Sequence, residues 1–182
     1  MAFFALNPLV IIESLVSAHH DIVMVFLVTM AIYHLLNKNY IRAFLLLFLS
    51  IGIKFATILL IPIFIIVLLW QIKRRLIENE TLFTYSLAAM VMAIIFASQR
   101  TELQPWYLLW LFPFVSLLTR RLLITVSFLL LSVGLLLHYV PFLYSGNWDP
   151  PIPTIKLWIT ASFLISSFIL WKIFKKAKGI ML

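Results

Sequence analysis

The chain consists of apolar segments separated by short polar breaks, and this pattern restricts it to a fold inside a membrane. Hydrophobic residues make up 64% of the sequence and charged residues only 11%, a composition typical of membrane proteins. The longest polar breaks have about a dozen residues, far fewer than the ~50 that a soluble domain needs. In lipid, each segment must satisfy its own backbone hydrogen bonds, which a helix does. We therefore predict an all-α, polytopic helical membrane protein, a single membrane domain over residues 1–182 with about seven membrane segments: Ile22–Leu36, Ala43–Ile53, Phe55–Trp70, Leu82–Ala97, Pro105–Leu118, Leu122–Val140 and Ile155–Trp171.

The sequence also excludes several kinds of site. It contains no cysteine, which excludes disulfides, thiolate metal ligands and a cysteine nucleophile. The four glycines are scattered and form no phosphate-binding loop or dinucleotide-binding pattern. The net charge of +8 comes from basic residues that cluster between the apolar segments, so we read it as membrane topology rather than nucleic-acid binding. We expect no metal and no cofactor.

Lys54 is the most unusual residue, because the run from Ala43 to Trp70 contains no other charged side chain. An isolated ammonium in an apolar segment is costly and marks a functional site by default. A single helix over the 30 residues from Ile41 to Trp70 would measure ~45 Å and exceed a ~30 Å bilayer core. Two short helices that turn near Lys54 would instead cross twice.

The distribution of basic residues favours the turn. With a turn at Lys54, eleven of the fourteen basic residues lie on one side; with one long helix the split drops to nine against four. The positive-inside rule then places the Lys/Arg-rich loops and the C-terminus in the cytoplasm. The opposite face, outer or lumenal, gathers most of the other polar residues: Glu13, His19, His20, Asp21, Lys54, Arg100, Glu102, Gln104, Trp106, Asn147, Trp148 and Asp149.

A short helix at Pro8–Ser17 is expected before the first segment, with Asn7 as its cap. It is too short to span the bilayer, so we expect it to lie at or dip into the outer interface, with Glu13 as its only charge. His19, His20 and Asp21 follow at the start of the next helix, where they either cap that helix or contact a sugar. His34 and His138 lie within apolar segments and are expected to be hydrogen-bonded packing residues.

Lys54 and Arg100 suit a phosphate on a lipid carrier, because an ammonium and a guanidinium both bind phosphate oxygens. The alternative for Lys54 is a lysine whose ammonium only reaches the lipid headgroups. Trp106 and Tyr107 either stack on a sugar ring or anchor the helix at the interface.

Four short motifs follow one another in the chain: Asn7-Pro8-Leu9, His19-His20-Asp21, Gly52-Ile53-Lys54-Phe55 before Pro62, and Gln104-Pro105-Trp106-Tyr107. Their arrangement resembles the C-terminal half of membrane glycosyltransferases of the GT-C class. It is most similar to mannosyltransferases that depend on polyprenyl-phosphate mannose, including family 87 and the enzyme that adds the first mannose of glycosylphosphatidylinositol. The pair His19-His20 departs from the commoner Gly-Asn or Gly-His pair, which leaves the role of that turn open.

The resemblance implies transfer of a sugar, mannose in the related enzymes, from a lipid-linked phosphosugar on the outer or lumenal face. It implies that Lys54 and Arg100 bind the donor phosphate, and that the sugar or acceptor cavity is lined by His20, Asp21, Gln104, Trp106 and Tyr107. In this class the catalytic acidic residue lies in a large outer loop between the first two spans, which this sequence lacks. The resemblance therefore implies an N-terminally truncated or split enzyme, and Asp21 and Glu13 are only candidate substitutes.

A non-enzymatic membrane protein, such as a small transporter, flippase or assembly subunit, is the alternative. A transporter places ionisable groups near the bilayer midplane, whereas here they gather on one predicted face, which favours an interfacial enzyme. The expected partners are the lipid bilayer, a polyprenyl-phosphate sugar and a missing N-terminal half; nucleic acid is not expected. Whether the chain alone is an enzyme stays open.

Overall fold

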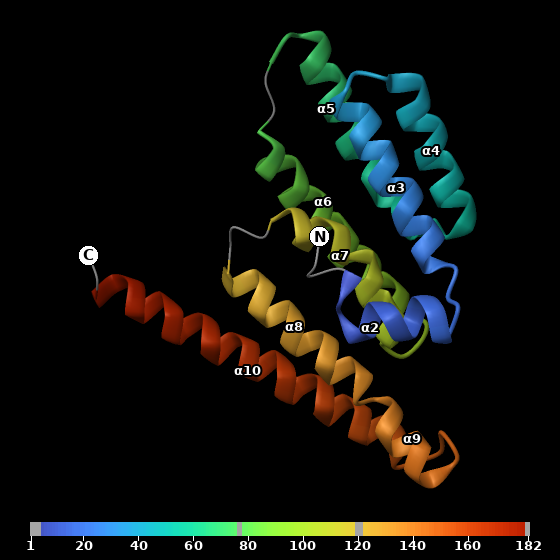
Figure 1. The fold of residues 1–182 in the computed structure, drawn as a ribbon, viewed down its shortest axis with the longest axis vertical. Coiled ribbons are helices and arrows are strands. Elements are labelled where there is room, and N and C mark those ends of the chain that lie inside the picture. The colour runs from blue at the N-terminus through green and yellow to red at the C-terminus, as the bar shows by residue number, and fades with distance from the viewer. Residues whose placement is uncertain (1–4, 76–77, 119–121, 181–182) are drawn as a thin grey trace.

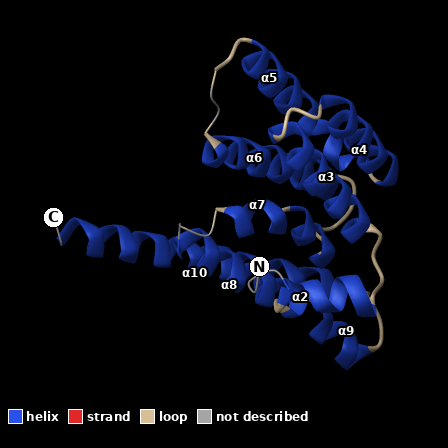
Figure 2. Cartoon of the chain, turned by 45° about the horizontal axis from the view of Figure 1, so that its top comes forward, coloured by secondary structure: helices blue, strands red, loops and turns tan. Residues whose placement is uncertain are grey.

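The computed structural model describes residues 5–75, 78–118 and 122–180, and in these residues it consists of helices and loops without a strand (Figure 2). The predicted all-α class is confirmed. The elements, labelled as in Figure 1, are α2 (Pro8–Ile11), η1 (Ile12–Val16), α3 (Asp21–Leu36), α4 (Tyr40–Ile53), η2 (Phe55–Leu60), α5 (Ile61–Ile72), α6 (Asn79–Ser98), η3 (Pro105–Trp110), α7 (Phe112–Leu117), α8 (Leu122–Leu136), α9 (Tyr139–Ser145) and α10 (Ile152–Ile180).

Four helical stretches among the described residues are long and apolar enough to cross a membrane: Phe55–Ile72, Asn79–Ser98, Ile124–Ser145 and Ile152–Phe174. A fifth span results if Pro8–Val16 and Asp21–Leu36, which are bent by 113° relative to each other, count as one. These helices suggest membrane embedding. About seven membrane segments were expected, and four or five of the described stretches are long and apolar enough to be full spans.

Two apolar segments are too short or too broken to span the bilayer. The 14 residues of α4 reach only about 21 Å at 1.5 Å per residue. The segment Pro105–Leu118 divides into η3 and α7 at Leu111. Pro113 lies just after this break, where a continuous α-helix would lose one hydrogen bond and bring the proline ring against the carbonyl of Leu109.

The predicted turn at Lys54 is confirmed. α4 ends at Ile53, and Lys54 has an extended backbone with φ −156° and ψ 129°. Two contacts then pair residues that lie at similar distances along the chain before and after Lys54. The hydroxyls of Ser50 and Thr57 lie 3.2 Å apart, and the rings of Phe44 and Phe64 meet edge to face at 5.9 Å. α4 and the η2–α5 stretch therefore form an antiparallel hairpin around Lys54 (Figure 1).

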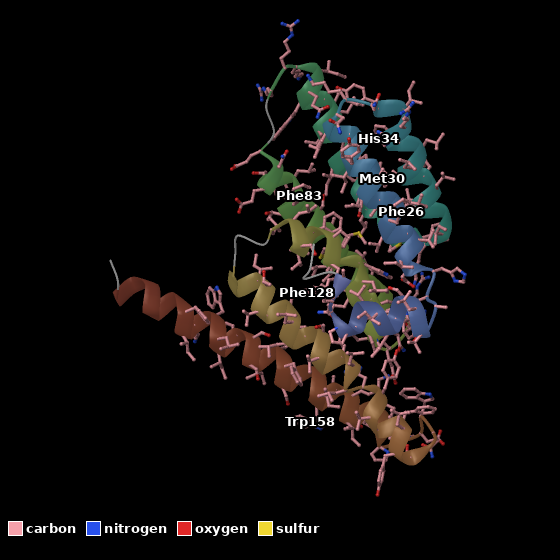
Figure 3. All side chains as sticks on the ribbon, in the orientation of Figure 1. Phe26, Met30, His34, Phe83, Phe128 and Trp158 are labelled. Carbon is pink, nitrogen blue, oxygen red and sulfur yellow. The ribbon has the colours of Figure 1, made fainter. Side chains whose placement is uncertain are left out.

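Apolar side chains form both the core and much of the outer surface. The core is centred on α3, whose Met24, Val28 and Leu35 are buried against neighbouring elements. Other large apolar side chains project outward, among them Phe26 on α3 and Trp158 on α10 (Figure 3). Exposed apolar side chains on this scale fit a lipid environment, because water would disfavour them.

The N-terminal helix is tied to the rest of the chain. Asn7 caps α2 by accepting a hydrogen bond from the Leu9 amide at 2.9 Å, and its amide donates to Ser132 of α8 at 3.1 Å. Leu9, Val10 and Glu13 are buried. We expected this helix to lie at or dip into the outer interface, and within the structure α2 and η1 pack into the helix bundle.

Candidate functional site

Lys54 forms an ion pair with Asp21. The Lys54 Nζ lies 2.7 Å from Asp21 Oδ1, and the two residues are 33 positions apart in the chain. The turn after α4 and the first residue of α3 meet at the same end of the bundle. The Asp21 side chain is only 5% exposed, whereas that of Lys54 is 35% exposed. The ammonium therefore keeps an accessible side, and two of its three hydrogens are free of Asp21.

Two aromatic residues of η3 complete the surroundings of this pair. The Trp110 indole Nε1 donates a hydrogen bond to Asp21 Oδ1. The Lys54 Nζ lies 5.1 Å from the Trp110 ring centre and 5.5 Å from that of Tyr107, within the range of a cation–π attraction. Tyr107 is fixed in turn by a 2.7 Å hydrogen bond between its hydroxyl and that of Thr101. The ammonium is thus held by a carboxylate and two rings.

A cavity of about 630 Å³ opens beside Lys54. Arg100 lines the same cavity, so the two predicted phosphate-binding residues face one space. The walls come from η2, from the end of α6 with the loop that follows, and from η3: Phe55, Ala56, Ile58, Leu59, Ala93, Phe96, Ala97, Gln99, Thr101, Tyr107 and Trp110. The cavity therefore contains two cations among largely apolar walls.

The predicted sugar-cavity residues separate into two groups. Tyr107 lines the cavity and Asp21 holds its lysine. Trp106 instead stacks on His19 at 4.1 Å between ring centres. His20 is exposed, and neither His20 nor Gln104 lines the cavity beside Lys54. The structure thus brings Lys54, Arg100, Asp21 and Tyr107 together, but not His20, Gln104 or Trp106.

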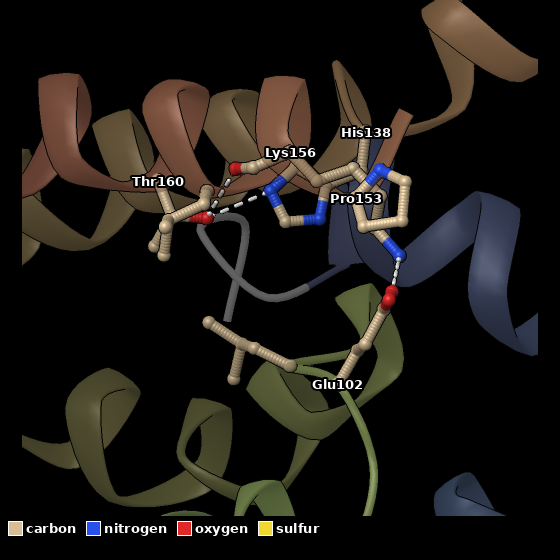
Figure 4. A pocket seen from close by; sticks show the side chains of 7 residues that line it. Glu102, His138, Pro153, Lys156 and Thr160 are labelled. Atoms are coloured by element: carbon tan, nitrogen blue, oxygen red, sulfur yellow. Dashed lines mark hydrogen bonds and ion pairs between the residues drawn. The ribbon is translucent and has the colours of Figure 1, made fainter. Parts of the chain in front are cut away.

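Glu13 does not line this cavity. Its side chain is fully buried, Tyr139 donates a 2.8 Å hydrogen bond to Oε1, and His19 Nε2 lies 3.5 Å from Oε2. These contacts tie η1 to α9 and to the loop before α3. His138, which was predicted to be a hydrogen-bonded packing residue, is hydrogen-bonded to Thr160 at 2.8 Å (Figure 4).

His19 belongs to the loop between η1 and α3, outside the apolar helices. Burial lowers the pKa of His19 below its usual value of 6.5, and the nearby Lys54 charge acts in the same direction while Asp21 opposes it. The neutral imidazole is therefore the favoured form in the folded chain.

Trp110 and Thr101 are the site residues that the sequence reading missed. A signal for Trp110 was present: it follows Tyr107 by three positions, and in a 3₁₀-helix such residues lie on the same side. A buried indole also needs an acceptor, which the Asp21 carboxylate supplies. As for metals, no three histidine or acidic side chains gather in a metal-binding group anywhere in the described parts of the chain.

The comparisons with known proteins give one match. Residues 1–71 match the family model described as alpha-(1->6)-mannopyranosyltransferase, N-terminal domain. This stretch contains Asp21 and Lys54 but not Arg100 or η3. No curated protein and no solved structure matches the chain. The match supports a mannosyltransferase family and, with it, sugar transfer in general. It is to an N-terminal domain; that the chain is the C-terminal part of an enzyme stays a prediction.

Proposed function

We propose that this chain takes part in transferring a mannosyl group from a polyprenyl-phosphate-linked donor to an acceptor, with Lys54 and Arg100 binding the donor phosphate. The observation that carries the proposal is the shared cavity: the only charged residues among those that line it are these two cations. The match of residues 1–71 to a mannopyranosyltransferase family supports the same chemistry.

The cavity suits a lipid-linked phosphate better than a soluble one. Phe55, Ile58 and Phe96 line it together with the two cations and are also exposed on the outer surface of the helices. An amphiphilic donor could place its phosphate at Lys54 and Arg100 while its hydrocarbon chain lies against these side chains.

The ion pair with Asp21 gives the lysine a defined position without removing its binding capacity. Asp21 accepts one hydrogen bond from the ammonium, so the remaining N–H groups can point to phosphate oxygens. As the bond between the phosphate and the anomeric carbon breaks, negative charge grows on the leaving phosphate. Fixed cations aimed at that charge lower the barrier. Asp21 acts here as a positioning residue, because its Oδ1 accepts hydrogen bonds from both Lys54 and Trp110 and so fixes the ammonium.

We further propose that the acidic residue that activates the acceptor comes from a separate N-terminal part of the enzyme, as in the GT-C class. The distribution of basic residues supports a reaction at the outer or lumenal face. Glu13 is a poor base for this donor because its carboxyl is buried, is held by Tyr139 and His19, and does not line the cavity beside Lys54.

The test is sugar transfer in membranes that contain the full-length protein and radiolabelled polyprenyl-phosphate mannose. Lys54→Ala should abolish transfer while membrane insertion and protein level stay unchanged. Arg42→Ala is the matched control, because it removes an exposed cation of α4 from the other end of the hairpin. Unchanged transfer with Lys54→Ala would remove Lys54 from the donor site. Accumulation of unreacted donor across the membrane without any transfer would favour the transporter alternative.

A further inference from the structure

An apolar groove of about 340 Å³ lies between α5 and the first turns of α6. The α5 wall is formed by residues that recur every three or four positions and so share one side of the helix: Ile63, Ile66, Val67 and Trp70. The α6 wall is formed by Thr81, Leu82 and Tyr85. Val67 and Leu82 are buried, whereas Ile66, Trp70 and Tyr85 are exposed. The groove is therefore open to the surroundings of the bundle.

This groove is separate from the cavity beside Lys54, although α6 contributes to both. On α6, the groove ends at Tyr85 and the cavity begins at Ala93. These two residues are about 12 Å apart along the helix axis, at 1.5 Å per residue. No residue lines both spaces. The groove thus lies near the end of α5, away from the turn at Lys54.

The walls of the groove suit a hydrocarbon chain and not a polar ligand. The surface that they expose is almost entirely carbon, so a buried hydroxyl or charge would find few partners there. The exposed residues Trp70 and Tyr85 combine an apolar ring with a polar tip, as residues at the level of lipid headgroups do. The groove therefore fits the acyl chain of a lipid whose headgroup lies near these rings.

Three cations follow the end of α5 directly: Lys73, Arg74 and Arg75. The Arg75 amide donates to the Trp70 carbonyl at 2.9 Å, so the backbone of these residues stays beside the groove wall. All three side chains are exposed, and none forms an ion pair with another residue in the described parts of the chain. They are available to an anion outside the protein.

The end of α3 adds to this positive charge. Gln71 Nε2 of α5 donates to the Leu35 carbonyl at 3.3 Å, and the Lys38 amide donates to the same carbonyl at 3.1 Å. Lys38 therefore stands beside the end of α5. With the three cations after α5, four positive charges stand against the two carboxylates at the start of α6, Glu78 and Glu80. The charge at this end of the bundle is positive.

Lys38 and Arg74 adopt left-handed backbone conformations, with φ of 60° and 54°. Each follows the C-cap residue of its helix, a position where glycine is the usual residue because it avoids a steric cost. A cation there complements the partial negative charge of the helix end. Its exposed side chain also reaches an anion in the headgroup region, which glycine cannot do.

We propose that the groove and the cations beside it bind one anionic phospholipid of the cytoplasmic leaflet. One acyl chain lies between α5 and α6, and Arg74 and Arg75 bind the phosphate of the headgroup. By the distribution of basic residues, this end of the bundle is expected on the cytoplasmic side, where the leaflet carries anionic phospholipids. The inference does not depend on the proposed function, because it uses none of the residues of the cavity beside Lys54.

The test is native mass spectrometry of the purified full-length protein in detergent, with dioleoylphosphatidylglycerol and dioleoylphosphatidylcholine at equal concentrations. The wild type should retain one phosphatidylglycerol with at least about fivefold higher affinity than phosphatidylcholine, since each cation near a headgroup contributes roughly a factor of five. Arg74→Gln/Arg75→Gln should remove this preference. Ile66→Trp, which fills the groove from an exposed position, should lower phosphatidylglycerol binding as well.

The matched control is Lys172→Gln/Lys175→Gln, which removes two cations from α10 and should leave the preference intact (Figure 1). Three results would overturn the inference: equal retention of the two lipids by the wild type, unchanged phosphatidylglycerol binding in Ile66→Trp, or an equal loss of preference in the control. Because Ile66, Arg74 and Arg75 are exposed, these variants should fold.

Undecaprenyl phosphate as a competitor separates a phospholipid from a prenyl phosphate, which also combines an anion with a hydrocarbon chain. If it displaces phosphatidylglycerol at a lower concentration than phosphatidylglycerol itself needs to bind, the groove belongs to a prenyl phosphate and the inference is refuted. Weaker competition supports the phospholipid. Since the readout is lipid binding and not sugar transfer, failure of this inference leaves the donor cavity untouched.

Discussion

Replacing Lys54 by methionine tests whether this lysine serves the donor or only neutralises Asp21. The substitution keeps most of the side-chain volume but removes the 2.7 Å bond to Asp21 Oδ1. Asp21, which is 5% exposed, then keeps only the Trp110 indole among its two recorded donors. A hydrogen bond between charged groups contributes about 1.5–3 kcal/mol. We expect the free energy of unfolding to fall by an amount within this range. It should not exceed the range, because the site is partly open and water can form a hydrogen bond to Asp21 in place of the ammonium.

Lys54→Met also removes the charged hydrogen bond that we propose between the ammonium and the donor phosphate. Losing about 1.5–3 kcal/mol there should lower kcat/KM roughly 10- to 150-fold, since each 1.4 kcal/mol corresponds to a factor of ten. The double variant Lys54→Met/Asp21→Asn separates the two effects. Its neutral amide still accepts from Trp110, so the thermal midpoint in detergent should return close to that of the wild type. Transfer from polyprenyl-phosphate mannose should stay low. If the double variant regains transfer together with stability, Lys54 is merely the counter-ion of Asp21 and the reasoning fails.

Three further predictions concern stability, each read from thermal unfolding in detergent. Asn7→Ala removes the cap of α2 and the contact with Ser132, and should lower the free energy of unfolding by about 1–3 kcal/mol. The control is Asn37→Ala, which removes an exposed amide. Equal effects of the two substitutions would contradict the buried role of Asn7. Gly134→Ala would bring the new Cβ to 2.6 Å from Phe163 Cγ and should destabilise the α8–α10 contact by about 1–3 kcal/mol. The control is Gly52→Ala, whose new Cβ has no atom within 4 Å; it should be neutral or stabilising by up to about 1 kcal/mol. Burial lowers the pKa of His19 in the folded chain, so the unfolded chain binds that proton more readily, and stability present above about pH 6.5 is lost as the pH falls. The midpoint of thermal unfolding should therefore drop more on acidification for the wild type than for His19→Gln. Equal drops in the two proteins would refute this.

The hairpin at Lys54 could be predicted from the sequence because two separate physical limits agree on it. A helix through Lys54 would be too long for the bilayer, and it would also scatter the basic residues over both sides. Neither argument needs a contact to be known. The contacts between Ser50 and Thr57, and between Phe44 and Phe64, agree with it.

The count of membrane segments could not be predicted in the same way, because hydrophobicity alone does not show where a helix breaks. α4 is apolar throughout but has 14 residues, and the segment after Pro105 is interrupted near Pro113. Such short helices are stable only because neighbouring elements cover them: Tyr107 to Leu109 and Phe112 to Val115 are buried. That packing depends on residues distant in the sequence.

The partners within the site were equally hidden from the sequence. Asp21 was expected either to cap the start of α3 or to contact a sugar, and in the structure it forms an ion pair with Lys54, 33 residues away. Trp110 was read as one more apolar residue of its segment. Lys156 and Glu102 were placed on the same predicted face, but their 2.6 Å contact joins the start of α10 to a loop 54 positions earlier. Periodicity describes single helices, whereas these pairs follow from how helices meet.

The Lys54–Asp21 pair is better explained by a ligand than by stability. A largely buried ion pair gains little over apolar residues of similar volume, since desolvation of both charges offsets their attraction, and replacing such a pair as a whole is often neutral or stabilising. A hairpin between two apolar helices therefore has no need of an ammonium at its turn. The arrangement would also be unusual for a lysine that only reaches the headgroups, because such a side chain needs no carboxylate and no aromatic rings around it. Here Asp21, Trp110 and Tyr107 fix the ammonium at the edge of a cavity shared with Arg100. Two cations held beside apolar walls are what a phosphate on a lipid chain requires. If Lys54→Met/Asp21→Asn regains stability but not transfer, the ammonium is needed for the donor and not for the folding of the hairpin.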